Sequence, residues 1–133
     1  MSDSFKLKKA IAVLAPSSDL AAVFPELRQQ GILRLEELLG LPARIMNSAR
    51  ITGKDLTPEL RAADLNEAFG DTNIIAIVCT IGGDDNIRLL PYLNSELIAR
   101  NPKPLLGYSD ITSLHLFLFK LGVPSLYGGA LLT

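Results

Sequence analysis

The sequence is poor in the residues that build redox and metal sites. Its 133 residues include one cysteine, Cys79, one histidine, His115, and no tryptophan. A single cysteine cannot form an internal disulfide, and a zinc ribbon needs at least two. A catalytic triad or a multi-histidine metal site contained within the chain would have to use His115. We therefore expect neither a bound metal nor a cofactor.

The sequence also lacks an excess of charge and a long apolar run. Thirteen Lys and Arg against fourteen Asp and Glu give a net charge of −1, so there is no basic field for nucleic acid. No segment approaches the roughly 20 apolar residues of a membrane span. The run Ala10–Ala15 is too short for a signal peptide, and Pro16 ends it. We expect a cytoplasmic protein that binds neither membranes nor nucleic acid.

Short apolar runs alternate with helical patterns along the chain, which has the length of one domain. The runs predict strands at 10–15, 43–46, 74–80 and 104–108, and the patterns predict helices at 25–39, 58–70 and 111–120. This alternation indicates an α/β fold with a mainly parallel sheet flanked by helices, a flavodoxin-like or Rossmann-like layer. Segment 47–56 is polar, and we expect a loop there.

The predicted helix at 25–39 has two features that bear on its packing. Its leucines form an apolar stripe, which consists of Leu27, Leu35, Leu38 and Leu39. Gly31 lies within the helix, where glycine costs about 1 kcal/mol relative to alanine. We expect another part of the chain to pack closely against Gly31.

Ligands of parallel α/β sheets bind at the carboxyl ends of the strands. Three loops are predicted at that edge, at 16–18, 82–85 and 108–110. In the last of these, Ser109 lies between a buried strand and a helix, as a serine does in a nucleophile elbow. The general G-x-S-x-G pattern fails, because Ile111 occupies its last position. The alternative is that Ser109 or Asp110 only caps the following helix.

The glycine loop, residues 82–85, also has two interpretations. Gly82 and Gly83 would let backbone amides approach a ligand closely, as an oxyanion donor or a phosphate cradle. The alternative is a tight turn in which Asp84 or Asp85 caps the next short helix. The chain contains neither a Walker loop nor a Rossmann glycine motif.

The two rare residues favour structural roles. Six residues separate Ser109 from His115, which is a rotation of about 240° on a helix, so the two side chains should point to different faces. Leucines and a phenylalanine surround His115 in the sequence, which favours a core histidine over a catalytic base. Cys79 lies in an apolar run and is expected to be a small core residue.

Five segments together, in this order, carry a specific resemblance that covers the chain from about Lys9 onward. They resemble the N-terminal half of the LD-carboxypeptidase family of serine peptidases, which includes muramoyl-tetrapeptide carboxypeptidases and microcin C immunity proteins. The segments are IAVLAPSS (11–18), RAADLNEAF (61–69), IGGDDNIRLLPYL (81–93), NPK (101–103) and GYSDITSLH (107–115). The Gly-Gly-Asp-Asp form of the glycine loop is closer to the immunity proteins.

The resemblance implies cleavage of an amide bond near a free carboxylate by a Ser-His-Glu triad. The family's serine maps onto Ser109, and its oxyanion hole maps onto the Asp110 amide and the Gly82-Gly83 loop. We expect Asp84 and Tyr108 to contact the substrate. The family's glutamate and histidine come from a C-terminal domain that we expect to lie outside residues 1–133. One departure is Gly128-Gly129-Ala130, where members usually have Gly-Pro-Ala.

The sequence thus predicts the nucleophile domain of a two-domain serine carboxypeptidase, with little activity by itself because its base is missing. Its substrate would be an LD-peptide of murein or a microcin-like peptide-nucleotide. A second hypothesis is a non-catalytic domain that binds a carboxylate or a peptide terminus. A nucleotide kinase is a third, disfavoured by the Gly-Tyr-Ser-Asp turn. An apolar face around 121–132 should remain exposed, and we expect it to form a homodimer.

Overall fold

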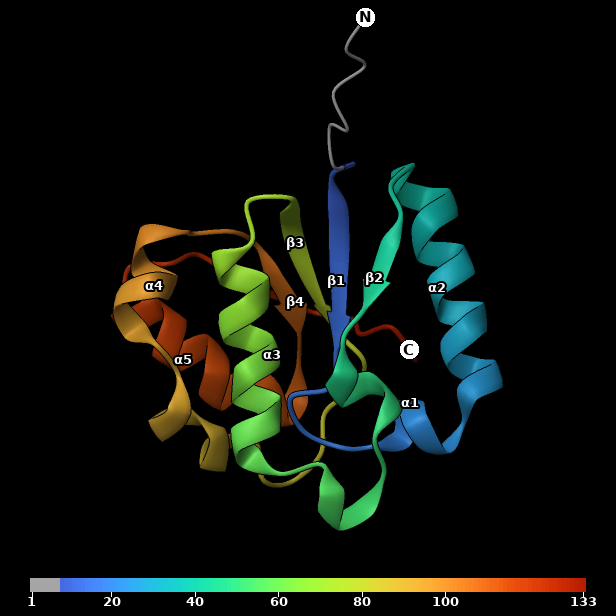
Figure 1. Cartoon of the computed structure of the whole chain (residues 1–133), viewed down its shortest axis with the longest axis horizontal. Coiled ribbons are helices and arrows are strands. Elements are labelled where there is room, and N and C mark those ends of the chain that lie inside the picture. Colours follow the sequence, from blue (N-terminus) through green and yellow to red (C-terminus); the bar gives the residue numbers. More distant parts are fainter. Residues whose placement is uncertain (1–7) are drawn as a thin grey trace, which may run out of the picture.

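The computed structural model describes residues 8–133, which form a parallel sheet with helices packed against it (Figure 1). The strands are β1 (Ala10–Leu14), β2 (Ala43–Ile45), β3 (Ile74–Cys79), β4 (Leu105–Gly107) and β5 (Leu126–Tyr127). The helices are α1 (Leu20–Val23), α2 (Pro25–Leu39), α3 (Pro58–Gly70), α4 (Ser95–Arg100) and α5 (Thr112–Lys120). Short 3₁₀ turns cover Asn47–Arg50, Gly53–Asp55, Asn86–Tyr92 and Ser109–Ile111.

The strand order is β2-β1-β3-β4-β5, and every neighbouring pair is parallel. Leu14 pairs with Cys79 at the end of β1 and β3, so the loops that follow these strands begin at the same edge of the sheet. The predicted α/β class and all four predicted strands are confirmed, with ends that differ by one or two residues. β5 and α1 were not predicted, because each is too short to give a periodic pattern.

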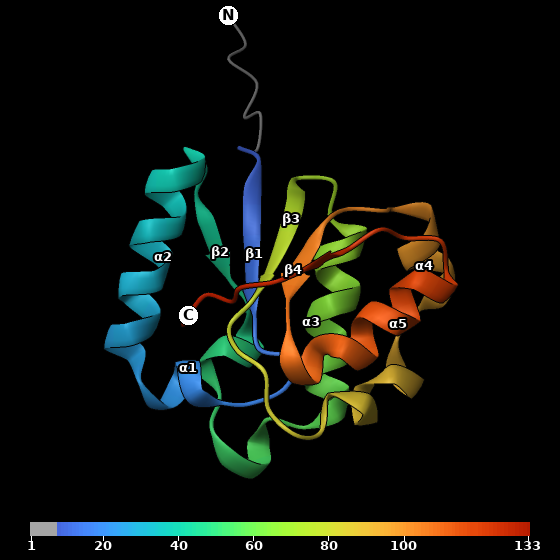
Figure 2. The same ribbon diagram turned by 180° about the vertical axis from the view of Figure 1, so that it is seen from behind.

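The main core lies between the sheet and the layer that contains α3, α4 and α5. Its buried side chains come from both sides, among them Leu14 and Ile77 from the sheet, Leu65 and Phe69 from α3, and Leu114 from α5. Figure 2 shows the last residues of the chain crossing the opposite face of the sheet towards α2. Among residues 8–133, no helix has both the length and the apolar character needed to cross a bilayer.

The leucine stripe predicted on α2 is not the buried side of the helix. Leu27 and Leu38 are 50% and 82% exposed, whereas the buried residue of α2 is Ile32. Close packing at Gly31 is confirmed, because a Cβ there would lie 2.7 Å from the Leu131 carbonyl oxygen. The side of α2 that meets the rest of the molecule is therefore set by a segment about 100 residues later in the chain. Segment 47–56, predicted as a loop, contains two 3₁₀ turns.

A lysine fixes the opposite edge of the sheet, where β3 begins. Lys103 Nζ donates to the carbonyl oxygens of Ala68, Asp71 and Ile74 at 2.8, 2.9 and 2.8 Å. Burial lowers the pKa of Lys103 below its usual value. One of the three acceptors, the Ala68 carbonyl group, lies in the last turn of α3, where carbonyl groups have no partner within the helix.

Candidate active site

Ser109 has a strained backbone where β4 turns towards α5. Its φ is +61°, and it is the one non-glycine residue of the described segment 8–133 with positive φ. Such a conformation costs about 1–3 kcal/mol and persists only where the surrounding structure enforces it. The Ser109 side chain is exposed at the carboxyl edge of the sheet. A strained, exposed serine between a strand and a helix has the geometry of a nucleophile elbow.

The glycine loop lies directly against Ser109. A Cβ built on Gly82 would lie 3.2 Å from Ser109 Cβ, 3.3 Å from the Asp110 amide nitrogen and 3.4 Å from Ser109 Oγ. Within residues 8–133, the amides of Gly82, Gly83 and Asp110 donate to no protein acceptor. Unpaired amides beside a serine oxygen are the arrangement an oxyanion hole requires.

The alternative in which Ser109 or Asp110 caps a helix is wrong. Neither side chain caps the 3₁₀ turn at Ser109–Ile111 or helix α5. Asp110 Oδ2 instead accepts hydrogen bonds from the hydroxyl of Ser17 and from the Asn86 amide. The alternative in which Asp85 caps the next short helix is wrong too, because Asp85 pairs with Arg61 and makes no cap bond.

Both ring nitrogens of His115 are in hydrogen-bonding contact with neighbouring groups of the fold. Its Nδ1 lies 2.6 Å from Ser125 Oγ, and its Nε2 lies 2.8 Å from the Gly107 carbonyl oxygen. The residue is 9% exposed, so the prediction of a core histidine is confirmed. Within residues 8–133, Ser109 Oγ has no hydrogen-bonding partner that could act as its base.

A tyrosine that the sequence analysis did not single out lies at the nucleophile turn. The Ser109 amide donates to the Tyr127 hydroxyl at 3.2 Å. Hydrogen bonding to the Thr112 side chain, and then to the Ser109 amide, lowers the pKa of Tyr127 below its usual value. Tyr127 lies in β5, a two-residue strand with no sequence pattern of its own. Its position next to Ser109 could not be predicted from spacing.

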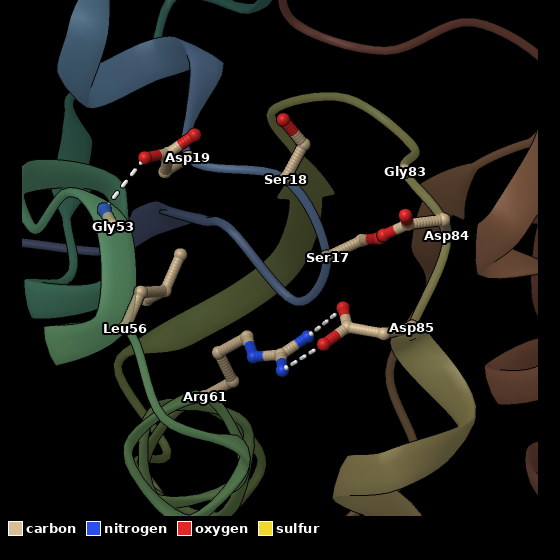
Figure 3. A pocket seen from close by; sticks show the side chains of 9 residues that line it. All are labelled: Ser17, Ser18, Asp19, Gly53, Leu56, Arg61, Gly83, Asp84 and Asp85. Atoms are coloured by element: carbon tan, nitrogen blue, oxygen red, sulfur yellow. Dashed lines mark hydrogen bonds and ion pairs between the residues drawn. The ribbon is translucent and has the colours of Figure 1, made fainter.

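The two predicted substrate residues border different hollows. Tyr108 lines a hollow of about 340 Å³ together with Gly82, Gly83 and Ser109. Asp84 lines a larger one of about 490 Å³, with Asp85 and Arg61 in its wall. Figure 3 shows Ser17, Ser18 and Gly83 along the side of this larger hollow. Ser18 and Gly83 border both hollows, so they separate the two.

Cys79 is fully buried, as predicted, and burial raises the pKa of its thiol far above the usual value. The thiol therefore stays protonated and unreactive at neutral pH. In the described part of the chain, no three His, Cys, Asp or Glu side chains lie together in a group that could hold a metal ion.

The strained serine, the free amides and the glycine loop all lie within the part of the chain that matches a family model. Residues 11–128 match the model of the LD-carboxypeptidase N-terminal domain. The chain belongs to the LD-carboxypeptidase family. The resemblance stated from the five sequence segments is thus confirmed.

Relatives within the LD-carboxypeptidase family are considerably longer than this chain. The putative carboxypeptidase YocD of Bacillus subtilis is 38% identical over 113 residues, which are 82% of this chain and 34% of YocD. The murein tetrapeptide carboxypeptidase of Pseudomonas aeruginosa is 35% identical over 121 residues, 89% of this chain and 38% of that protein. The crystal structure of an MccF-like protein from Streptococcus pneumoniae in complex with AMP has a TM-score of 0.83 and 36% identity, and the match covers 96% of this chain and 39% of that one. The chain spans about a third to two fifths of the length of these relatives.

Proposed function

We propose that this chain is the nucleophile domain of a serine carboxypeptidase that hydrolyses an amide bond next to a free carboxylate. Ser109 is the nucleophile, and the amides of Asp110 and of Gly82-Gly83 form the oxyanion hole. The positive φ of Ser109, together with its exposed side chain, is the observation that supports this role most directly. A base outside residues 8–133 is required, because His115 is held by Ser125 and Gly107.

In this mechanism Ser109 Oγ attacks the amide carbonyl carbon while the external base takes the hydroxyl proton. The carbonyl oxygen becomes an anion and accepts hydrogen bonds from the free amides. The C–N bond then breaks, and the base returns the proton to the leaving amine. Water hydrolyses the acyl-serine by the same route and restores Ser109. Tyr108 and Asp84 contact the parts of the substrate on either side of Ser18 and Gly83.

The relatives support two substrate classes. The name of the Pseudomonas aeruginosa relative points to murein tetrapeptides, and the AMP in the Streptococcus pneumoniae structure points to peptide-nucleotides. Both classes contain an amide bond near a carboxylate, so both suit the mechanism. Without its base, the chain alone would bind such a ligand without cleaving it, which is the second candidate function.

A chimera tests the proposal, in which residues 11–128 replace the matching segment of YocD. We expect it to release the terminal amino acid from an LD-linked murein tetrapeptide or from an aminoacyl sulfamoyl nucleoside. Ser109→Ala should abolish the release with little change in stability, because an exposed hydroxyl contributes little to the fold. His115→Ala should reduce stability more than turnover. A folded Ser109→Ala chimera that retains activity would refute the proposal.

A further inference from the structure

We propose that the Asp110 side chain is a positioning residue that holds two loops against the nucleophile turn. The loops are the glycine loop with Asn86 at its end, and the Pro16–Ser18 loop after β1. The role is separate from that of the Asp110 amide, which belongs to the oxyanion hole. The inference rests on the proposed function, since the geometry being held is that of the oxyanion hole.

One oxygen atom of Asp110 joins all three loops. Asp110 Oδ2 accepts a hydrogen bond from Ser17 Oγ, 93 residues earlier in the chain. The same oxygen accepts from the Asn86 amide at 2.9 Å. Hydrogen bonds to a carboxylate are about twice as strong as those between neutral groups. The Asp110 carboxylate therefore connects the loops that follow β1, β3 and β4, which are far apart in the sequence.

Asn86 carries the connection further. Its side chain is fully buried, its Oδ1 accepts from Ser113 Oγ at 2.7 Å, and its Nδ2 donates to the Pro16 carbonyl oxygen at 2.9 Å. The oxygen and the nitrogen of this buried amide group are thus both hydrogen-bonded, one to α5 and the other to the Pro16–Ser18 loop. A buried polar network with its members satisfied fixes a single arrangement of the groups it joins.

Arg61 of α3 also connects the glycine loop to the Pro16–Ser18 loop, through Asp85 and Pro16. The guanidinium, 2% exposed, pairs with both Asp85 oxygens at 2.8 and 2.9 Å. It also donates to the Pro16 carbonyl oxygen at 3.1 Å. Figure 3 shows the two parallel bonds between Arg61 and Asp85. The adjacent residues Asp85 and Asn86 are therefore both anchored.

The glycines before these anchors have few bonds of their own. Among residues 8–133, the one long-range backbone bond at Gly82-Gly83 runs from the Ser18 amide to the Gly82 carbonyl oxygen at 3.3 Å. The direction of the free glycine amides thus depends on Asp85 and Asn86 behind them and on Ser18 beside them. Both supports lead back to Asp110, through Asn86 and through Ser17. Oxyanion donors act only when they are held in place before the reaction, so loss of the Asp110 carboxylate should affect turnover.

NMR of the full 133-residue chain tests the structural part. In Asp110→Ala we expect hydrogen exchange of the Asn86 amide to become at least about tenfold faster and the Gly82 and Gly83 amide signals to shift or broaden. Asp110→Asn keeps a carbonyl oxygen that can accept both bonds, and should restore the wild-type signals. Ser17→Ala removes one bond and offers a milder variant if Asp110→Ala unfolds. Unchanged Gly82 and Gly83 signals in folded Asp110→Ala would overturn the proposal.

Turnover in the YocD chimera tests the functional part, with Lys103→Met as the destabilised control at the far edge of the sheet. We expect Asp110→Ala to lower kcat by about 10²-fold with a smaller change in KM, and Asp110→Asn to recover most of it. Equal losses of kcat in Asp110→Ala and Lys103→Met would overturn the positioning role. If the wild-type chimera is folded but inactive, the proposed function fails, and the NMR result alone decides whether Asp110 holds the loops.

Discussion

The strain in the Ser109 backbone is held by hydrogen bonds on both sides of the residue. Its amide donates to Tyr127, and its carbonyl oxygen accepts from Thr112 Oγ1 at 2.6 Å. A further bond runs from the Ile111 amide to the Tyr108 carbonyl oxygen at 3.3 Å. These contacts offset a conformational cost of about 1–3 kcal/mol, and strain of this kind, which clusters at active sites, supports the role proposed for Ser109.

A second single residue at the site, Gly83, has no room for a side chain. A Cβ there would lie 2.9 Å from the Ser18 amide nitrogen and would also overlap the Ser17 hydroxyl. Gly83→Val should push the glycine loop away from the Pro16–Ser18 loop. It should therefore lower kcat of the YocD chimera by about 10²–10³-fold, the effect of losing one oxyanion donor. Gly70→Ala is the matched control, since its Cβ would make ordinary contacts with Leu97 at 3.4–3.8 Å. Near-normal turnover of a folded Gly83→Val chimera would contradict the assignment.

At the scale of the elements, local pattern predicted the strands and longer helices but not which sides of them meet. The apolar run of β1 and the second half of β3, from Ile77 to Cys79, are buried on both faces of the sheet, and continuous apolar runs of this kind indicate a buried strand. Helix α2 has apolar residues on more than one side, and Leu131 of the chain end decides which side packs. The bonds of Asp110 to Ser17 and Asn86 were missed for the same reason, because they join residues that only the folded sheet brings together.

Lys103 should contribute to stability at the junction of α3, β3 and β4, through its three hydrogen bonds. Replacing it with methionine removes three hydrogen bonds and leaves the Ala68 carbonyl group, in the last turn of α3, without a partner. We expect Lys103→Met to lower the free energy of unfolding by about 2–3 kcal/mol in urea titrations. Arg100→Met, at an exposed ion pair with Glu96, should change it by less than about 0.5 kcal/mol. Equal stabilities of the two variants would show that the Lys103 contacts contribute little.

At the scale of the whole molecule, apolar side chains remain uncovered near β5. Within 121–132, Leu126 and Tyr127 are exposed as predicted, but Val123 is buried, and Leu121, Leu131 and Leu132 are half-buried. Phe119 on α5 is 82% exposed. We propose that this surface forms a homodimer. Sedimentation velocity at rising concentration should show a dimer, and Leu126→Lys should shift it towards monomer, while Leu38→Lys on α2 should not. A monomer at every concentration would contradict the proposal.

The division of the catalytic groups between this chain and a second part is the central claim, and covalent labelling of Ser109 tests it most directly. A fluorophosphonate bonds to a serine oxygen only when a base removes its proton. Mass spectrometry should find no adduct on the 133-residue chain at times when the YocD chimera carries one. In the chimera, the adduct should lie on the peptide that contains Ser109. Ser109→Ala should remove that adduct. Labelling of the isolated chain at the rate of the chimera, or of a different residue in the chimera, would contradict the account.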